Sequence, residues 1–253
     1  MHGHKIFSQI EKIIFMTKID LYLGGDLGVW ALQNVSSESI ARVFTKDKVI
    51  ADIAVSYNLA VEMSNPNFID FQPSKIGFSV HYPIIFRWEI ISKYSKIYNL
   101  HPGYLPWGRG YYPIFWALWE ETPAGATLHE INTGIDEGSI VAQTQVEYYP
   151  VDTGGTLFER VRQAEKDLFL EYYPKLVVKG QDIPAYPQSE GGSYHTKKEF
   201  FNFKQNANWE SMNGRDLIKL IRCLTFPGYT GLEINLGTKK FELHLELLSI
   251  PRN

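Results

Sequence analysis

Apolar residues along this chain gather in short runs that are separated by longer segments with a helical spacing. The runs that have the length and the β-branched or aromatic content of buried strands are 19–23, 41–44, 76–80 and 97–100. Two of the segments between them, 47–59 and 88–94, predict helices. Strands that alternate with helices in this way indicate a parallel sheet with crossover helices, and therefore an α/β domain.

The middle of the chain adds two alternating segments and a long helix. Residues 126–131 and 140–146 predict strands on either side of a glycine-containing turn. Residues 156–178 have an amphipathic pattern that predicts a helix with Thr156 as its N-cap, and Pro174 is expected to bend its last turns.

The last part of the chain has a different character. Residues 180–195 are rich in Pro, Gly and Ser and predict a linker or a binding loop. A helix is expected over 211–224, and a closing hairpin over 231–235 and 239–248. We therefore expect three parts: an N-terminal extension over 1–16, a catalytic domain over 17–180 and a C-terminal extension over 181–253.

Glycines follow the first expected strand, over Gly24–Gly28, before a helix expected to begin near Val29. Glycines at a strand-to-helix turn allow backbone N–H groups to approach a phosphate closely. Here the GxGxxG pattern is incomplete and no P-loop lysine follows, so a tight turn is favoured over a nucleotide site.

Composition and charge exclude several classes of protein. The 253 residues carry a net charge of −3, and the longest basic cluster is the pair Lys197-Lys198, which argues against a nucleic-acid partner. No apolar run approaches the roughly 18 residues of a membrane span. The single cysteine, Cys223, lies in an apolar segment and is expected to be a small buried residue in a protein of the reducing cytoplasm.

Three residues are candidates for chemistry. Asn99 and His101 are two apart at the end of an expected strand, so their side chains point to the same side. Asp136 lies in the turn between two later strands, where a carboxylate can enter a cleft. An amide that donates to an oxyanion, an imidazole and a carboxylate together suit acyl transfer to an amine.

The order of these residues resembles a known family. The stretch Asn99-Leu100-His101-Pro102-Gly103-Tyr104-Leu105-Pro106-Trp107-Gly108-Arg109-Gly110 is similar to the Asn-x-His-Pro-x-x-Leu-Pro-x-x-Arg-Gly motif of 10-formyltetrahydrofolate-dependent formyltransferases. The segments 125–129 and 136–140 resemble that family's Gly-x-Thr-x-His and Asp-x-Gly-x-Ile motifs. The resemblance implies a Rossmann-like, mostly parallel sheet with flanking helices, extended here by a small C-terminal helix and a β-hairpin.

The resemblance also implies roles for the site residues. Asn99 is expected to hold the developing oxyanion, His101 to support proton transfer, and Asp136 to orient His101 and to accept a proton from the attacking amine, directly or through water. No metal is required. The residues expected to contact 10-formyltetrahydrofolate are Ile84, Ile85, Phe86, Gly134, Ile135 and Asp136. The alternative for the first three of these is a place in the core after a strand.

The C-terminal extension narrows the choice of acceptor. The chain lacks the long basic barrel of methionyl-tRNA formyltransferases and continues past residue 180, where glycinamide ribonucleotide formyltransferases usually end. The segments 187–198 and 224–229 resemble those of dTDP-amino-sugar N-formyltransferases. The residues that this resemblance places at the acceptor are Arg109, Gly110, Gln188, Ser189, Tyr194, Phe226 and Tyr229. A turn that packs on the core is the alternative for the last two.

The resulting expectation is formylation of a dTDP-linked amino sugar, dTDP-4-amino-4,6-dideoxyglucose first, for O-antigen or another surface polysaccharide. A 3-amino isomer and glycinamide ribonucleotide are the alternative acceptors. A non-catalytic folate or nucleotide-sugar binder and a folate hydrolase are alternatives of other classes. A homodimer that uses the terminal hairpin is expected, because an isolated hairpin leaves an open edge.

Overall fold

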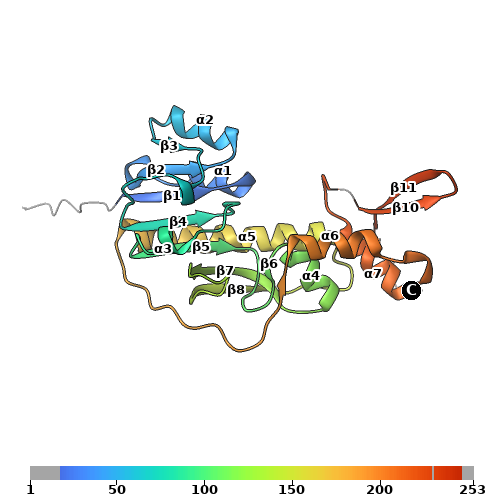
Figure 1. Ribbon diagram of the computed structural model, residues 1–253. Helices are drawn as coiled ribbons and strands as arrows, with labels where there is room; N and C mark the ends of the chain where they lie inside the picture. The colour runs from blue at the N-terminus through green and yellow to red at the C-terminus, as the bar shows by residue number, and fades with distance from the viewer. Residues whose placement is uncertain (1–17, 230, 247–253) are drawn as a thin grey trace, which may run out of the picture.

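The computed structural model describes residues 18–229 and 231–246 (Figure 1). The strands are β1 (Ile19–Leu23), β2 (Ile40–Thr45), β3 (Val61–Glu62), β4 (Ile76–Val80), β5 (Lys96–His101), β6 (Arg109–Gly110), β7 (Ala124–Glu130), β8 (Ile140–Val146), β9 (Tyr194–His195), β10 (Leu232–Leu236) and β11 (Lys239–Leu243). The helices are α1 (Gly25–Gln33), α2 (Lys48–Ser56), α3 (Trp88–Ile91), α4 (Pro113–Glu120), α5 (Gly154–Tyr173), α6 (Lys197–Asn206) and α7 (Gly214–Leu224). The expected extension over 1–16 and the end of the expected hairpin, 247–248, lie outside the described residues.

Within the described residues, seven strands form the main sheet in the order β3-β2-β1-β4-β5-β7-β8. The strands from β3 to β5 pair in parallel, whereas β5–β7 and β7–β8 are antiparallel. The predicted mostly parallel α/β sheet is therefore confirmed. β5 lies between a parallel and an antiparallel neighbour, so that Asn99 is opposite Ser79 of β4 and His129 of β7.

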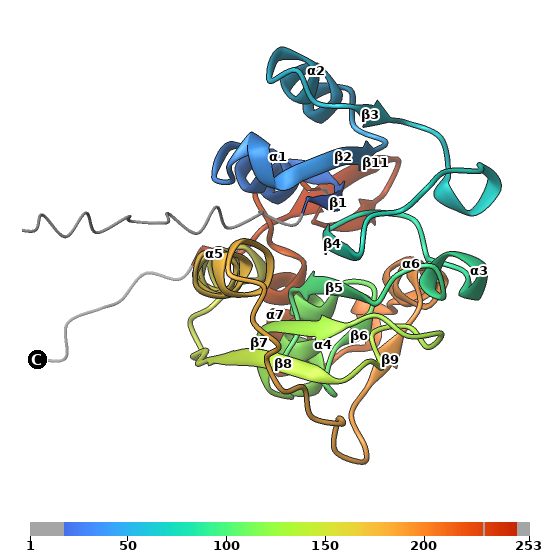
Figure 2. The same cartoon turned by 90° about the vertical axis from the view of Figure 1, so that its left-hand side faces the viewer.

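The two faces of the sheet are covered by different elements. Side chains alternate along β1: Leu21 belongs to a core that α1 and α5 complete, and Tyr22 belongs to a second core with Phe86 and Tyr94. Figure 2 shows α1 and α5 on one side of the sheet and α3 on the other. No helix in the described part of the chain is both long enough and apolar enough to cross a membrane.

The beginnings of two helices differ from the sequence-based expectation. α1 begins at Gly25, so most of the expected Gly24–Gly28 turn is helical. Gly24 caps this helix without a side-chain hydrogen bond, and the usual start signal is therefore missing. Thr153, not Thr156, caps α5, because the two side chains form a reciprocal capping box in which Thr156 is the third residue.

The end of α5 and the helix α7 agree with the expectations. From Pro174 the chain changes from α-helix to a π-helical turn that ends at Val178, which fits the expected bend. α7 buries Leu220 and Leu224 together with Cys223, whose thiol is fully buried. Burial raises the pKa of the Cys223 thiol to about 12, so it is the small buried residue that we expected.

Phe78 on β4 provides a test of the main core. Its fully buried ring lies 5.5 Å from the rings of both Phe169 and Tyr173 on α5. We expect Phe78→Ala to lower the free energy of unfolding by about 4 kcal/mol, because it leaves a cavity between sheet and helix. Urea unfolding measures this change. Leu170→Ala is the control, since that side chain is half exposed on the same helix and should cost under about 1 kcal/mol.

Candidate active site

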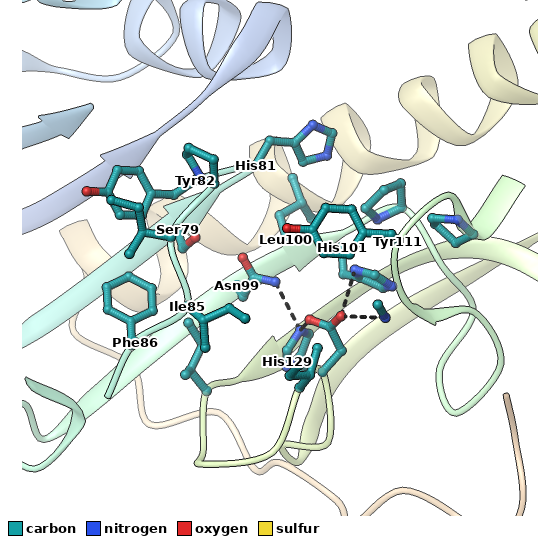
Figure 3. Close-up of a pocket in the computed structure, with 18 of the residues that line it drawn as sticks. Ser79, His81, Tyr82, Ile85, Phe86, Asn99, Leu100, His101, Tyr111 and His129 are labelled. Carbon is teal, nitrogen blue, oxygen red and sulfur yellow. Dashed lines mark hydrogen bonds and ion pairs between the residues drawn. The ribbon is translucent and has the colours of Figure 1, made fainter. Parts of the chain in front are cut away.

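A cavity of about 410 Å³ opens at the carboxyl ends of β4 and β5 (Figure 3). Asn99, His101 and Asp136 all line it. The other residues expected to contact the folate line the same cavity: Ile84, Ile85, Phe86, Gly134 and Ile135. Phe86 also packs in the second core, which was the alternative for this residue. Ligands of open α/β sheets bind at this edge, which makes the cavity the candidate active site.

Asp136 reaches His101 from the loop between β7 and β8. Its backbone has a φ of 53°, a left-handed conformation that is uncommon for an aspartate. The carboxylate Oδ2 lies 3.7 Å from Nδ1 of His101 and accepts a hydrogen bond from the backbone N–H of Gly110 at 3.0 Å. The loop therefore places a charge beside the imidazole and holds it with a backbone donor.

The surroundings of His101 determine where its ring carries a proton. The ring is buried, and Nε2 lies 2.8 Å from the backbone carbonyl oxygen of Gly108. Because a carbonyl oxygen can only accept, Nε2 carries a proton and donates it to this hydrogen bond. Nδ1 is the nitrogen that faces Asp136. A second proton on the ring would be bound at Nδ1, next to the Asp136 carboxylate.

His129 is a site residue for which the sequence indicated no role. Its Nδ1 donates to the backbone oxygen of Glu130 at 2.8 Å, which leaves Nε2 to accept from the Asn99 amide nitrogen at 3.1 Å. The same Nε2 lies 3.6 Å from Oδ1 of Asp136. His129 therefore orients the amide of Asn99. The sequence signal is its place at the end of the Gly-x-Thr-x-His segment 125–129, whereas its contact with Asn99 depends on the pairing of β7 with β5.

The charge of Asp136 follows from these neighbours. Burial alone raises the pKa of this carboxyl. The nearby His101, the contact with His129 and the Gly110 N–H act in the opposite direction, and together they hold the pKa of Asp136 well below its usual range. Asp136 is therefore ionised at every pH at which such an enzyme would be assayed.

This depressed pKa predicts a pH-dependent contribution to stability. An aspartate in the unfolded chain titrates near pH 4, and the folded carboxyl titrates lower, so its stabilising effect is complete above about pH 5. The effect is lost as the pH falls below about 4. We expect the difference in unfolding free energy between the native chain and Asp136→Asn to fall as the pH is lowered from about 4 to 2. Urea unfolding at each pH measures it, and a difference that varies only near neutral pH contradicts the assignment.

A second, more apolar cavity of about 350 Å³ adjoins the first. Its walls come from α6, α7 and the turn after α7, and Phe226 and Tyr229 line it together with Phe200 and Phe201. The cavities share Tyr112, Pro102 and Pro113. The Tyr112 ring stacks on Phe200 with 4.0 Å between ring centroids. Phe226 also packs on the core beside Phe158, so it is both a core residue and a cavity residue.

The remaining expected acceptor contacts lie in a different place. Gly110 lines the first cavity, but Arg109 donates to the backbone oxygen of Gly191 at 2.8 Å and is already engaged. Gln188 donates from Nε2 to the backbone oxygens of Asp136 and Gly138, at 2.7 and 2.9 Å. Ser189 is exposed, and Tyr194 is 47% exposed. The structure therefore brings Phe226 and Tyr229 together and leaves Gln188, Ser189 and Tyr194 along a separate segment.

One wall of the first cavity is tied to α5 by a partly buried hydrogen bond. His81 follows β4, and its Nε2 lies 2.6 Å from Oε1 of Glu165, a fully buried residue of α5. Figure 3 shows the His81 ring turned toward α5. In the described ranges, 18–229 and 231–246, no three His, Cys, Asp or Glu side chains are placed to hold a metal ion.

Comparisons with known proteins agree with this geometry. The formyl transferase family matches residues 77–172, which include Asn99, His101 and Asp136. The formyltransferase PseJ from Anoxybacillus kamchatkensis, in complex with UDP-4,6-dideoxy-4-formamido-L-AltNAc and tetrahydrofolate, is 30% identical, with 71% of this chain and 96% of PseJ covered and a TM-score of 0.55. The chain belongs to the formyltransferase family. It is therefore an enzyme of the one-carbon transferase class, as the motif around Asn99 and His101 predicted.

Two further structures resemble this formyltransferase in fold. A 4-N formyltransferase from Francisella tularensis is 22% identical, with 93% of this chain and 100% of that chain covered and a TM-score of 0.80. An N-formyltransferase from Helicobacter canadensis, in complex with folinic acid and dTDP-3-aminofucose, is 20% identical, with 87% and 85% covered and a TM-score of 0.71. The predicted formyltransferase fold with its C-terminal helix and hairpin is thus confirmed.

Proposed function

We propose that this formyltransferase moves a formyl group from 10-formyltetrahydrofolate to the amino group of a nucleotide-linked amino sugar. The expected acceptor is dTDP-4-amino-4,6-dideoxyglucose. The observation that carries this proposal is the pair of adjoining cavities, one with Asn99, His101 and Asp136 and the other lined by aromatic rings. An aromatic cavity suits a planar base, and a base held there places its attached sugar toward the shared wall at Tyr112.

The first cavity fits the folate substrate. Its wall is apolar over Ile84, Ile85 and Phe86, as an aromatic ring system requires. Tyr82 also lines it, and the buried Tyr82 hydroxyl has no hydrogen-bond partner among the described residues. Burial raises the pKa of this hydroxyl, which keeps it neutral and able to donate or accept. PseJ, the 30% identical relative, was seen with tetrahydrofolate.

The proposed chemistry uses the three motif residues. The acceptor nitrogen attacks the formyl carbon, a C–N bond forms, and negative charge develops on the formyl oxygen. Asn99 donates to that oxygen from an amide that His129 orients. His101 takes up the proton that the attacking amine loses, and the adjacent Asp136 stabilises the resulting imidazolium. As the carbonyl reforms, the bond between the formyl carbon and the folate nitrogen, which carries an aryl ring, breaks, and this nitrogen takes the proton from His101.

The low pKa of Asp136 changes the balance between its two expected roles. A carboxylate that is held ionised this strongly is a weak proton acceptor. We therefore favour a role for Asp136 in orienting His101 and stabilising its imidazolium. We do not favour Asp136 as the base that takes the proton of the amine directly. A water molecule or His101 then carries the proton from the amine.

An acceptor panel tests the proposal. The enzyme is incubated with 10-formyltetrahydrofolate and dTDP-4-amino-4,6-dideoxyglucose, its 3-amino isomer, a UDP-linked 4-amino sugar or glycinamide ribonucleotide. We expect kcat/KM for a dTDP-linked sugar to exceed that for glycinamide ribonucleotide by at least about a hundredfold, because glycinamide ribonucleotide has no nucleobase to occupy the aromatic cavity. Turnover of glycinamide ribonucleotide alone contradicts the proposal. Release of formate without any acceptor indicates a folate hydrolase.

The proposal extends to the assembly and the cellular setting. The hairpin β10–β11 stands apart from the main sheet (Figure 1) and exposes Leu236 and Phe241. We propose that these side chains contact a second copy of the chain in a homodimer. Sedimentation of the native enzyme and of Leu236→Glu would test this assembly. A formylated nucleotide sugar suits the cytoplasmic synthesis of O-antigen or another surface polysaccharide, with no nucleic acid or membrane as partner.

A further inference from the structure

A segment far from the catalytic motifs in sequence holds both loops of the active site. Residues 186–196, here called the strap, run below the sheet in orange in Figure 1. They contact the loop 106–111, which follows β5, and the loop 136–138, which follows β7. Neither contact is a helix or main-sheet interaction. The strap is therefore an additional connection between the loop that contacts His101 and the loop that carries Asp136.

Ser193 is the contact of the strap with the loop that holds His101. Its hydroxyl accepts the backbone N–H of Gly108 at 2.9 Å, and the carbonyl of the same Gly108 accepts from His101 Nε2 at 2.8 Å. The backbone of Ser193 makes two more bonds, donating to Pro106 and accepting from Arg109, at 3.1 and 3.0 Å. Ser193 therefore fixes the position of the Gly108 carbonyl, which accepts the hydrogen bond from His101.

Gln188 is the contact of the strap with the loop that carries Asp136. Its Nε2 donates to the backbone oxygens of both Asp136 and Gly138. Asp136 has a positive φ, a conformation that persists for a non-glycine residue only where the surroundings enforce it. The Gln188 side chain supplies this constraint from outside the loop.

The last residues of the strap fix the remaining donor to Asp136. β9 pairs with β6, and the carbonyl of His195 accepts from Tyr111 at 2.8 Å. A Cβ at Gly110 would lie 2.2 Å from the His195 carbonyl oxygen, so only glycine permits this approach. The N–H of Gly110 is the group that donates to Asp136. His195 is itself anchored, stacked on Trp116 at 3.8 Å with its nitrogens about 3 Å from Glu120 and Glu199.

We propose that the strap is a positioning element that sets the spacing between His101 and Asp136, with Ser193 and Gln188 as its positioning residues. Each backbone group that touches the two catalytic side chains, the Gly108 carbonyl and the Gly110 N–H, belongs to a residue that the strap holds. This inference rests on the proposed roles of His101 and Asp136. It also implies that the Gln188 amide nitrogen donates its hydrogen bonds within the protein and does not bind the nucleotide sugar.

Single substitutions test the proposal. Ser193→Ala and Gln188→Met remove the two side-chain contacts with little change in volume. We expect kcat to fall at least about tenfold in each, with KM for both substrates within about threefold, because small displacements of catalytic groups are costly whereas most of each cavity wall stays intact. Ser193→Thr keeps the hydroxyl and should recover most of kcat. The controls are Ser211→Ala and Gln163→Met, exposed residues whose side chains bond Asn208 and Asp167 away from the site.

The kcat per folded molecule separates positioning from a purely structural role. A positioning role lowers this kcat in Ser193→Ala, leaves KM nearly unchanged and is rescued by Ser193→Thr, whereas a purely structural role changes only the fraction of folded enzyme. An unchanged kcat per folded molecule overturns the proposal, whatever happens to the melting temperature.

Amide hydrogen exchange keeps this test independent of the proposed function. We expect faster exchange over 106–111 in Ser193→Ala and over 136–138 in Gln188→Met, and no change in the two controls. Unchanged exchange in both loops overturns the positioning role even if the native enzyme formylates none of the acceptors offered. If the native enzyme formylates none of the acceptors, the proposed function is contradicted. The exchange data still test whether the strap positions the two loops.

Discussion

Asp136→Asn is expected to lower kcat by about a thousandfold, the largest effect of any single substitution considered for this enzyme. The carboxylate lies 3.7 Å from His101 Nδ1 and 3.6 Å from His129 Nε2, and it is ionised at neutral pH. An amide of the same shape carries no charge, so the imidazolium that forms at His101 loses its counter-ion. Steady-state turnover of 10-formyltetrahydrofolate with the best acceptor measures the loss.

The binding of both substrates should be largely unchanged in Asp136→Asn, because most of each cavity wall is intact. Asp167→Asn is the control, an exposed aspartate of α5 that bonds Gln163 outside the site. A kcat within about threefold of the native enzyme would contradict the catalytic assignment and favour a non-catalytic binding protein.

Asn99→Leu is expected to lower kcat by several hundredfold, roughly the cost of removing one oxyanion donor. The Asn99 amide is held at 3.1 Å from His129 Nε2, which leaves its second N–H directed at the cavity. Leucine has a similar volume and no donor, so charge on the formyl oxygen loses its partner. The KM for the folate should change little, since the interaction strengthens only in the transition state.

Asn206→Leu is the matched control for this second substitution. Asn206 is exposed at the end of α6 and bonds the backbone of Asn202. An Asn99→Leu enzyme that keeps its kcat but loses folate affinity would place Asn99 in ground-state binding and not at an oxyanion.

The central strands could be predicted from the sequence because their short runs are mostly apolar, although Asp20 and Ser79 lie within them. β1 and β4 lie where the runs 19–23 and 76–80 indicated. Alternation in β7 and β8 predicted strands but not their antiparallel pairing, since the period of two is the same for both directions.

Two helices were missed for opposite reasons. α4, with the sequence PIFWALWE, is apolar on nearly all sides, so it has no amphipathic period to recognise. Its N-cap Tyr112 has a positive φ and no capping side chain. α6 does have a capping box from Thr196 and Glu199, but it lies between the predicted loop 180–195 and the predicted helix 211–224, and its weak apolar face predicts no helix.

The candidate site was predictable where a motif places residues on one strand. Asn99 and His101 are two apart on β5, and their common cavity follows from that spacing. The contacts of Gln188 were not predictable, because they join residues about fifty positions apart through a segment without regular structure. The role of His129 depends in the same way on the register between β5 and β7.

The most direct test of the account follows the formyl carbon itself. Labelled 10-formyltetrahydrofolate and dTDP-4-amino-4,6-dideoxyglucose are mixed with the native enzyme or with Asp136→Asn, and NMR records where the label goes. We expect a labelled formamide on the sugar amine with the native enzyme, formed about a thousandfold more slowly with the variant. Label that remains on the folate, or appears as formate with every nucleotide-linked amino sugar offered, would contradict it.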